Sequence, residues 1–378
     1  MVIGITCYPV AGGSGIVATE LGQQLAARGH QVHFISYALP FRLDRYQTNL
    51  MFHAVETTAY QLFKFPPYTL TLASKMADVA RNYSLDILHM HYAIPHATCA
   101  YLARQLLADT GSCQPKIITT LHGTDITLVG SDASFYDITR FSINSSDGLT
   151  AVSDYLAQET QEVFKVNKPL RVIHNFFDSK RFKPHSDQCS RSEFVQSDEF
   201  LISHISNFRP VKRALDVIEI FDKIAAEIPA RLLLVGEGPD IVLARRQIKK
   251  KGLEDRVVFL GNQSRVEAIL PCCDLFLLPS EEESFGLAAL EALACGVPVI
   301  GTSGTGMVEV VDHGKTGFLL PVGDTSSMAR AGLSLLKDPP RLQAFKKAAV
   351  ETALAKFSAE KIVSQYESFY EETLSGGR

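Results

Sequence analysis

The alternation of short apolar runs with helix-like stretches is the feature that most constrains this chain. Six apolar runs of strand length occur in the first half and six in the second, and helix-like stretches such as 16–28 and 98–108 lie between them. Such alternation predicts βαβ units and parallel sheets. The runs cover 2–7, 32–36, 87–91, 117–121, 148–152 and 171–174, and then 200–206, 231–236, 257–260, 275–278, 297–300 and 317–320.

A polar stretch with little periodicity, 178–199, separates the two sets of runs, and we interpret it as a linker. The 378 residues are enough for two domains of ordinary size. We therefore predict one α/β domain over 1–178 and a second over 179–357. The segment 358–378 predicts an amphipathic helix, whose apolar face we expect to pack back toward the N-terminal domain.

Charge and composition exclude several classes of function. The net charge of −4 argues against a nucleic-acid partner, since polyanion-binding proteins usually carry a basic excess. Residues 1–178 hold 12 basic and 14 acidic side chains, so this half of the chain lacks the basic excess that membrane-surface binding usually needs. No signal peptide or membrane span is evident, and the seven cysteines lack a CxxC pattern. We therefore expect a cytoplasmic protein with reduced thiols and no stable membrane association.

A glycine-rich loop, 8–22, follows the first apolar run and leads into a helix. Its segment 13–18 fits the dinucleotide pattern G-x-G-x-x-[G/A], and amides at such a helix start form an anion site. A dinucleotide fold also needs an acid at the end of the second strand, about 20 residues on. Ser36 and Tyr37 occupy that place, and the first acid is Asp44. A cradle for another phosphate ligand is favoured, with a structural turn and a dehydrogenase cofactor site as alternatives.

Two glutamates eight residues apart, Glu283 and Glu291, follow the strand-like run 275–278. We expect a helix to begin at about 285–286. Amides at its start can bind diphosphate or sugar oxygens, and a neighbouring carboxylate can accept hydrogen bonds from sugar hydroxyls. The alternative is that both glutamates lie on a solvated helix face. The intervening "SFGL" and the following "ACGVPVIGT" favour a binding site.

Histidines gather near the ends of two strands in the first half. His89 and His91 would share one strand face, as metal ligands can, but no convincing third ligand is apparent. His122 closes the run 117–121 and is either a ligand contact or structural. Asp125 either orients its neighbours or caps a helix.

With these motifs, the whole chain resembles the retaining GT-B glycosyltransferases of family 4, which use nucleotide-sugar donors. Within that family it is most similar to the bacillithiol-pathway branch that transfers GlcNAc to L-malate. Many members place an arginine where this chain has Asn207. The matching segments are 12–15 (GGSG), 122–125 (HGTD), 207–213 (NFRPVKR), 234–239 (LVGEGP), 259–262 (FLGN) and 283–291 (ESFGLAALE).

The resemblance implies two Rossmann-like doubly wound domains that face each other across a cleft. It implies UDP-GlcNAc as donor, L-malate as acceptor, and neither a cofactor nor a metal. The implied catalytic residues are His122, Lys212 and Glu283. The implied donor-binding residues are Ser14, Gly15, Asn207, Arg209, Lys212, Glu283, Ser284, Phe285, Gly286, Leu287 and Glu291. The implied acceptor-binding residues are Lys64, Tyr92, Thr120 and Arg140.

Other functions stay open at this point. Within family 4 the acceptor could instead be an inositol phosphate or a lipid. A UDP-GlcNAc epimerase of the same fold and a nucleotide-sugar-binding protein without turnover are further alternatives. The pair Glu283 and Glu291 disfavours the epimerase, and Lys212 together with His122 disfavours the inactive binding protein. Relatives of this kind also leave a homodimer open.

Overall fold

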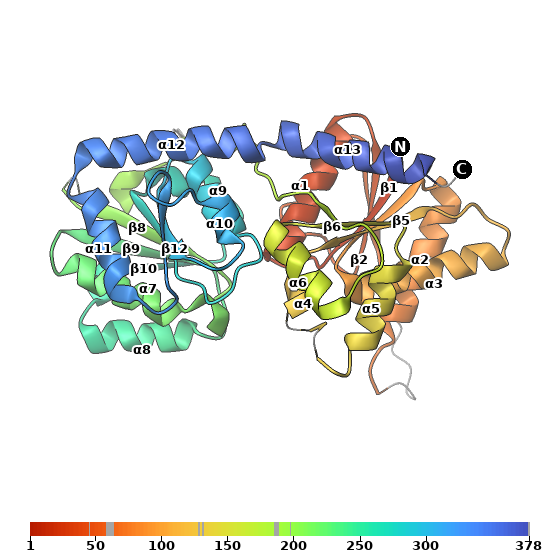
Figure 1. The fold of residues 1–378 in the computed structure, drawn as a ribbon, viewed down its shortest axis with the longest axis horizontal. Helices are drawn as coiled ribbons and strands as arrows, with labels where there is room; N and C mark the ends of the chain where they lie inside the picture. The colour runs from red at the N-terminus through yellow and green to blue at the C-terminus, as the bar shows by residue number, and fades with distance from the viewer. Residues whose placement is uncertain are drawn as a thin grey trace. The chain divides into compact units, whose positions relative to one another are not determined.

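The computed structural model describes residues 1–44, 46–57, 64–127, 129–130, 132–184, 189–196 and 198–376. The chain forms two compact units (Figure 1). The first unit combines Met1–Asn175 with Glu360–Arg378, and the second unit is Phe176–Ala359. The chain therefore leaves the first unit once and returns to it for its last helix.

The first unit contains a seven-stranded parallel sheet in the order β3-β2-β1-β4-β5-β6-β7. The predicted parallel strands are present, and β3 is an addition at the sheet edge. Its residues are mostly half-buried, so it lacks the continuous apolar run that marks the other strands. The elements are β1 Val2–Thr6, α1 Gly13–Ala27, β2 Gln31–Ser36, β3 Leu50–Ala54, α2 Tyr68–Tyr83, β4 Ile87–His91, α3 Thr98–Asp109, β5 Lys116–Leu121, α4 Thr124–Thr127, α5 Tyr136–Ser145, β6 Gly148–Ala151, α6 Asp154–Phe164, β7 Arg171–Val172 and α13 Ala359–Ser375.

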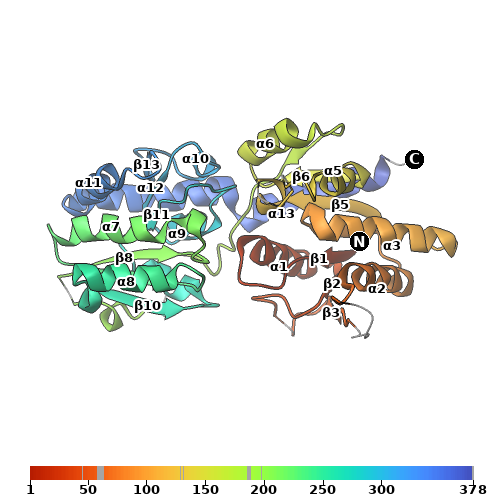
Figure 2. The same cartoon turned by 90° about the horizontal axis from the view of Figure 1, so that it is seen from below.

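Helices cover both faces of this sheet. Helices α2 and α3 lie side by side over one face (Figures 1 and 2), where Leu88 and Met90 of β4 join their apolar core. Side chains alternate along a strand, so His89 and His91 point to the opposite face. There the Tyr370 hydroxyl of α13 lies 2.7 Å from His89 Nδ1. Helix α13 therefore closes the face that carries the histidines.

The second unit contains a six-stranded parallel sheet in the order β10-β9-β8-β11-β12-β13. All six strands were predicted. Apolar side chains of α7, α8 and α11 form one core with β8, β9 and β11. The elements are β8 Phe200–Ile205, α7 Ala214–Ala225, β9 Ala230–Val235, α8 Ile241–Lys251, β10 Val257–Gly261, β11 Leu275–Leu278, α9 Leu287–Ala294, β12 Val299–Thr302, α10 Met307–Val310, β13 Gly317–Leu320, α11 Thr325–Leu336 and α12 Pro339–Phe357. The prediction of two doubly wound domains is confirmed.

The segment 178–199, which we expected to be a linker, is instead packed into the second unit. Phe182 and Val195 are buried there, and Cys189 forms a disulfide with Cys272. The expectation of reduced thiols is therefore wrong for this pair. Its spacing in the sequence, 83 residues, carries no recognisable pattern, so only the fold could bring the two sulfurs together. Within the described residues, no helix combines the length and apolar character needed to cross a bilayer.

Candidate active site

The strand orders locate where a ligand would bind in each unit. In doubly wound sheets, ligands bind beyond the carboxyl ends of the strands, where the strand order reverses. That point lies between β8 and β11 in the second unit and between β1 and β4 in the first. Lys212 follows β8 and Glu283 follows β11, so both candidate residues of the second unit lie at its switch point.

The structure brings Lys212 and Glu283 into direct contact. Lys212 Nζ lies 2.6 Å from Glu283 Oε1, and the Ser280 hydroxyl donates to the same oxygen at 2.8 Å. The Glu283 side chain is 10% exposed and the Lys212 side chain 21%. The Glu283 carboxylate holds Lys212 at the switch point, where the lysine ammonium can approach a diphosphate. Ser280 was not among the predicted site residues.

The segment after Glu283 forms the start of α9, close to its predicted position. Gly286 precedes the helix with φ +93°, a conformation that favours glycine. The Phe285 ring is buried and packs edge-on against Phe357, so only its backbone is suited to a ligand. Ser284 and Leu287 are half-buried, and Glu291 is 5% exposed in the second turn of α9.

The loop after β8 also carries the predicted Arg209, and Arg213 follows it. Arg209 is exposed, whereas Arg213 Nε donates to Asp216 at 2.6 Å and is held on α7. The buried Asn207 Oδ1 has no hydrogen-bond partner among the described residues. His204 lies in β8 before this loop, and its Nδ1 donates to the Leu277 carbonyl at 2.9 Å. Burial lowers the pKa of His204 to about 4.

In the first unit, the glycine-rich loop follows β1 at the switch point. Helix α1 begins at Gly13, and its first hydrogen bond runs from the Ile16 amide to the Gly12 carbonyl. The amides of Gly13, Ser14 and Gly15 precede that bond, as an anion cradle requires. A side chain at Gly15 would lie 2.5 Å from the Tyr8 carbonyl, but one at Gly13 would meet nothing within 4 Å.

Four histidines of the first unit, His89, His91, His96 and His122, lie close together. His91 Nδ1 lies 2.9 Å from His122 Nε2, and the Tyr92 ring stacks on His122 with centroids 5.7 Å apart. Tyr92 has φ +109°, an uncommon value outside glycine, and its ring contacts Tyr8 edge-on. Burial lowers the pKa of His122 to about 3. A neutral His122 therefore lies at the carboxyl end of β5, next to Tyr92.

Asp125 joins the loops that carry His122 and Tyr92. Its carboxylate accepts hydrogen bonds from the amides of His122 and Gly123, at 3.1 and 2.9 Å, and from Ala93 at 3.1 Å. Burial raises the pKa of Asp125 to about 6 even though these amides lower it. Of the two predicted roles, the structure favours the orienting one, because the bonded amides belong to two different loops.

The predicted acceptor residues do not come together as a group. Lys64 is exposed, with its Nζ 5.6 Å from the Phe65 ring centre. Arg140 lies on α5 and lines a pocket of about 550 Å³ with five other residues, among them Lys168. Thr120 lies within β5, which ends at Leu121, and not in a loop beyond the strand end. Its buried hydroxyl lies 2.7 Å from both His89 Nε2 and the Thr150 hydroxyl, so it contacts the two neighbouring strands.

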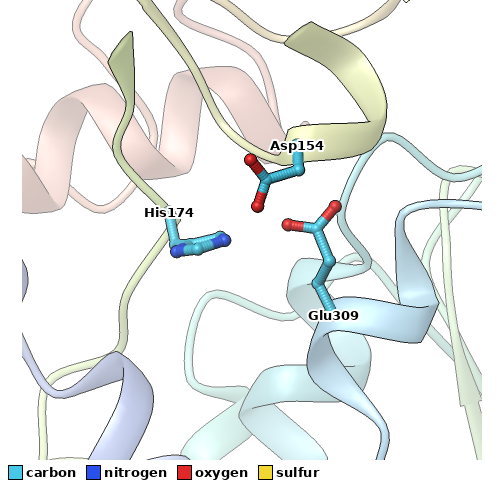
Figure 3. A group of neighbouring side chains, drawn as sticks. All are labelled: Asp154, His174 and Glu309. Carbon is cyan, nitrogen blue, oxygen red and sulfur yellow. The ribbon is translucent and has the colours of Figure 1, made fainter. Parts of the chain in front are cut away.

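Two sets of candidate metal ligands, His89 with His91 and Asp154 with His174, do not meet the requirements of a metal site. Within the described part of the chain, His89 and His91 are not members of any group of three close ligand atoms. Figure 3 draws Asp154 and His174 of the first unit, whose ligand atoms lie within 4.8 Å, together with Glu309 of α10 in the second unit. Asp154 begins α6 and His174 follows β7. Two ligands in one unit are fewer than the three or four that protein zinc sites use.

Comparison with known proteins identifies the family. The model for Glycosyltransferase Family 4 matches residues 11–181, and the model for glycosyl transferases group 1 matches 186–352. The chain is 51% identical over 373 residues to N-acetyl-alpha-D-glucosaminyl L-malate synthase of Bacillus anthracis, covering 98% of this chain and 97% of the relative. The chain belongs to glycosyltransferase family 4. This confirms the family that the sequence motifs indicated.

Two solved structures have a similar fold. Sucrose-phosphate synthase from Thermosynechococcus elongatus matches with a TM-score of 0.79 at 22% identity, covering 99% of both chains. Anabaena HepE in complex with UDP and glucose matches with a TM-score of 0.80 at 20% identity, covering 97% of this chain and 98% of that one. At such identities the likeness establishes the fold of this glycosyltransferase.

Proposed function

We propose that this glycosyltransferase transfers GlcNAc from UDP-GlcNAc to the hydroxyl of L-malate with retention of the α configuration. The observation that carries the proposal is the pair Lys212 and Glu283 at the switch point of the second unit. The full-length similarity to an L-malate synthase supports the choice of donor and acceptor. We therefore expect the product to enter bacillithiol biosynthesis.

In the proposed reaction, the malate hydroxyl oxygen forms a bond to the anomeric carbon as the bond from that carbon to the UDP oxygen breaks. Attack takes place on the face that UDP leaves, and the β-phosphate takes the hydroxyl proton. The charge that develops on UDP needs a fixed cation, and Lys212 is suited to supply it. Arg209, exposed in the same loop, adds a second cation. We therefore propose that no metal is required.

Each remaining site residue has a proposed role. Glu283 and Glu291 accept hydrogen bonds from sugar and ribose hydroxyls, and the backbone of 284–287 binds donor oxygens. Ser14 and Gly15 offer amides to the donor diphosphate, and His122 contacts the donor sugar. Lys64, Tyr92 and Arg140 remain the proposed acceptor residues. We no longer propose Thr120 as an acceptor residue, because its buried hydroxyl contacts His89 and Thr150. A homodimer and a cytoplasmic location remain predictions.

The test is UDP release from UDP-GlcNAc with a panel of acceptors, measured with and without EDTA. L-malate should release UDP, whereas succinate, which has the same two carboxylates and no hydroxyl, should not. The anomeric proton coupling of the product should show the α linkage. Release with inositol phosphate or a lipid acceptor, but not with L-malate, would reject the acceptor and keep the family. Release that stops with EDTA would reject the metal-independent mechanism.

A further inference from the structure

The contact between His91 and His122 bears on which nitrogen of His122 carries the proton. His91 is the last residue of β4, and His122 follows β5, its neighbour in the sheet. The register places His91 opposite Thr120, so the two imidazoles meet just beyond the strand ends. Their nitrogens, His91 Nδ1 and His122 Nε2, lie 2.9 Å apart. One ring must donate its proton and the other must accept it.

Both rings are neutral, so each carries one N–H and one lone pair. Burial lowers the pKa of His122 to about 3 and that of His91 well below its usual range. Two arrangements satisfy the short contact. In the first, His91 donates from Nδ1 and His122 keeps its proton on Nδ1. In the second, His122 donates from Nε2 and His91 keeps its proton on Nε2.

The surroundings of His91 determine which of the two arrangements is more stable. His91 is fully buried, and its Nε2 has no hydrogen-bond partner among the described residues. The second arrangement would bury an N–H donor without an acceptor, which native structures rarely tolerate. The first leaves only a lone pair without a donor, which is less costly. The first arrangement is therefore the stable one.

We propose that His91 is a positioning residue that fixes His122 as the Nδ1–H tautomer. His122 Nδ1 has no partner among the described residues, so this N–H is the group that faces a ligand. Resting on the proposed function, the inference makes His122 a hydrogen-bond donor to an oxygen of the sugar nucleotide. It also excludes His122 as a general base through Nδ1, which fits a reaction in which the β-phosphate takes the proton.

The first test needs no substrate. The full chain, labelled with ¹⁵N-histidine, is measured by long-range ¹H–¹⁵N correlation at pH 7, and His122→Asn assigns the His122 signals. The protein contains its own references, because His96 and His204 each donate Nδ1–H to a backbone carbonyl, at 2.7 and 2.9 Å. His122 should show the same tautomer as these two. A proton on Nε2 of His122 would overturn the proposal.

The second test uses two substitutions that differ in the donor they leave. His91→Asn can keep an N–H near the position of Nδ1, whereas His91→Leu removes it. We expect His91→Leu to lower kcat about 10-fold, a typical loss for an orienting partner, and His91→Asn to recover most of that loss. The His122 signals should shift only in the leucine variant. Equal kcat values for the two folded variants would overturn the role of His91. If the wild type releases no UDP with L-malate, the function fails while the tautomer measurement still decides this inference.

Discussion

Removal of the ammonium at Lys212 gives the most direct test of the site. Lys212→Met keeps the length of the side chain and leaves the Glu283 carboxylate with the Ser280 hydroxyl. For two unit charges 2.6 Å apart, Coulomb's law at an effective dielectric constant of 20 gives about 6 kcal/mol before desolvation is subtracted. Desolvation offsets most of this attraction, so we expect the free energy of unfolding to fall by about 1–2 kcal/mol.

The expected effect on the reaction is larger. A fixed charge that stabilises a leaving group contributes about 100–1000-fold to kcat, or about 2.7–4 kcal/mol. Lys251→Met is the matched control, since Lys251 pairs with Asp222 at 2.7 Å and is 22% exposed, against 21% for Lys212. Steady-state UDP release and urea unfolding are measured for both variants. The control should lose similar stability and keep its kcat within about twofold. A folded Lys212→Met enzyme with more than a tenth of the wild-type kcat would refute the reasoning.

Three further predictions concern the loop, the disulfide and pH. Gly13→Ala should keep or raise the melting temperature and lower kcat/KM, because its methyl group fills open space above the cradle, whereas Gly15→Ala should lower both; equal melting temperatures would contradict this contrast. Cys189→Ser should lower the free energy of unfolding by about 2–5 kcal/mol, given the 83-residue separation from Cys272, and wild type in dithiothreitol should match it. Burial lowers the pKa of four histidines in the first unit to about 3 or 4, so folded protein resists their protonation, and the stability present above about pH 6.5 is lost as the pH falls toward 4. Urea unfolding at pH 6 and pH 5 should show a loss of about 1.4 kcal/mol per histidine over that pH unit, and a flat profile would contradict the shifts. These histidines are His33, His89, His96 and His122.

The sequence predicted most of the fold because buried parallel strands leave continuous apolar runs. Strand β3 was missed because a half-buried edge strand leaves no such run. Lys212 and Glu283 could be placed in one candidate site from the sequence, and the strand ends that bring them together meet at a switch point, but their direct contact was not predicted. The disulfide between Cys189 and Cys272 was missed because it depends on how a segment without periodicity packs.

The hydrogen-bond partners of the histidines could not be predicted from the sequence. The motif HMHYAIPH places His89 and His91 on one strand face, but the partner of His91 depends on the register between β4 and β5. Thr120 was misplaced for a different reason. Strand β5 ends at Leu121, as the run 117–121 predicted, so Thr120 lies inside the strand and not in a loop, and its side chain is buried on one face of the sheet.

The return of the chain to the first unit sets an order for its synthesis. Residues 176–359 are complete before α13 leaves the ribosome, so the second unit has all its parts first. The first unit begins synthesis earlier but must wait for Tyr370 to cover His89. A nascent or truncated chain without its last 19 residues would therefore expose the histidine face of β4 to water. The first unit therefore begins synthesis first and completes its fold last.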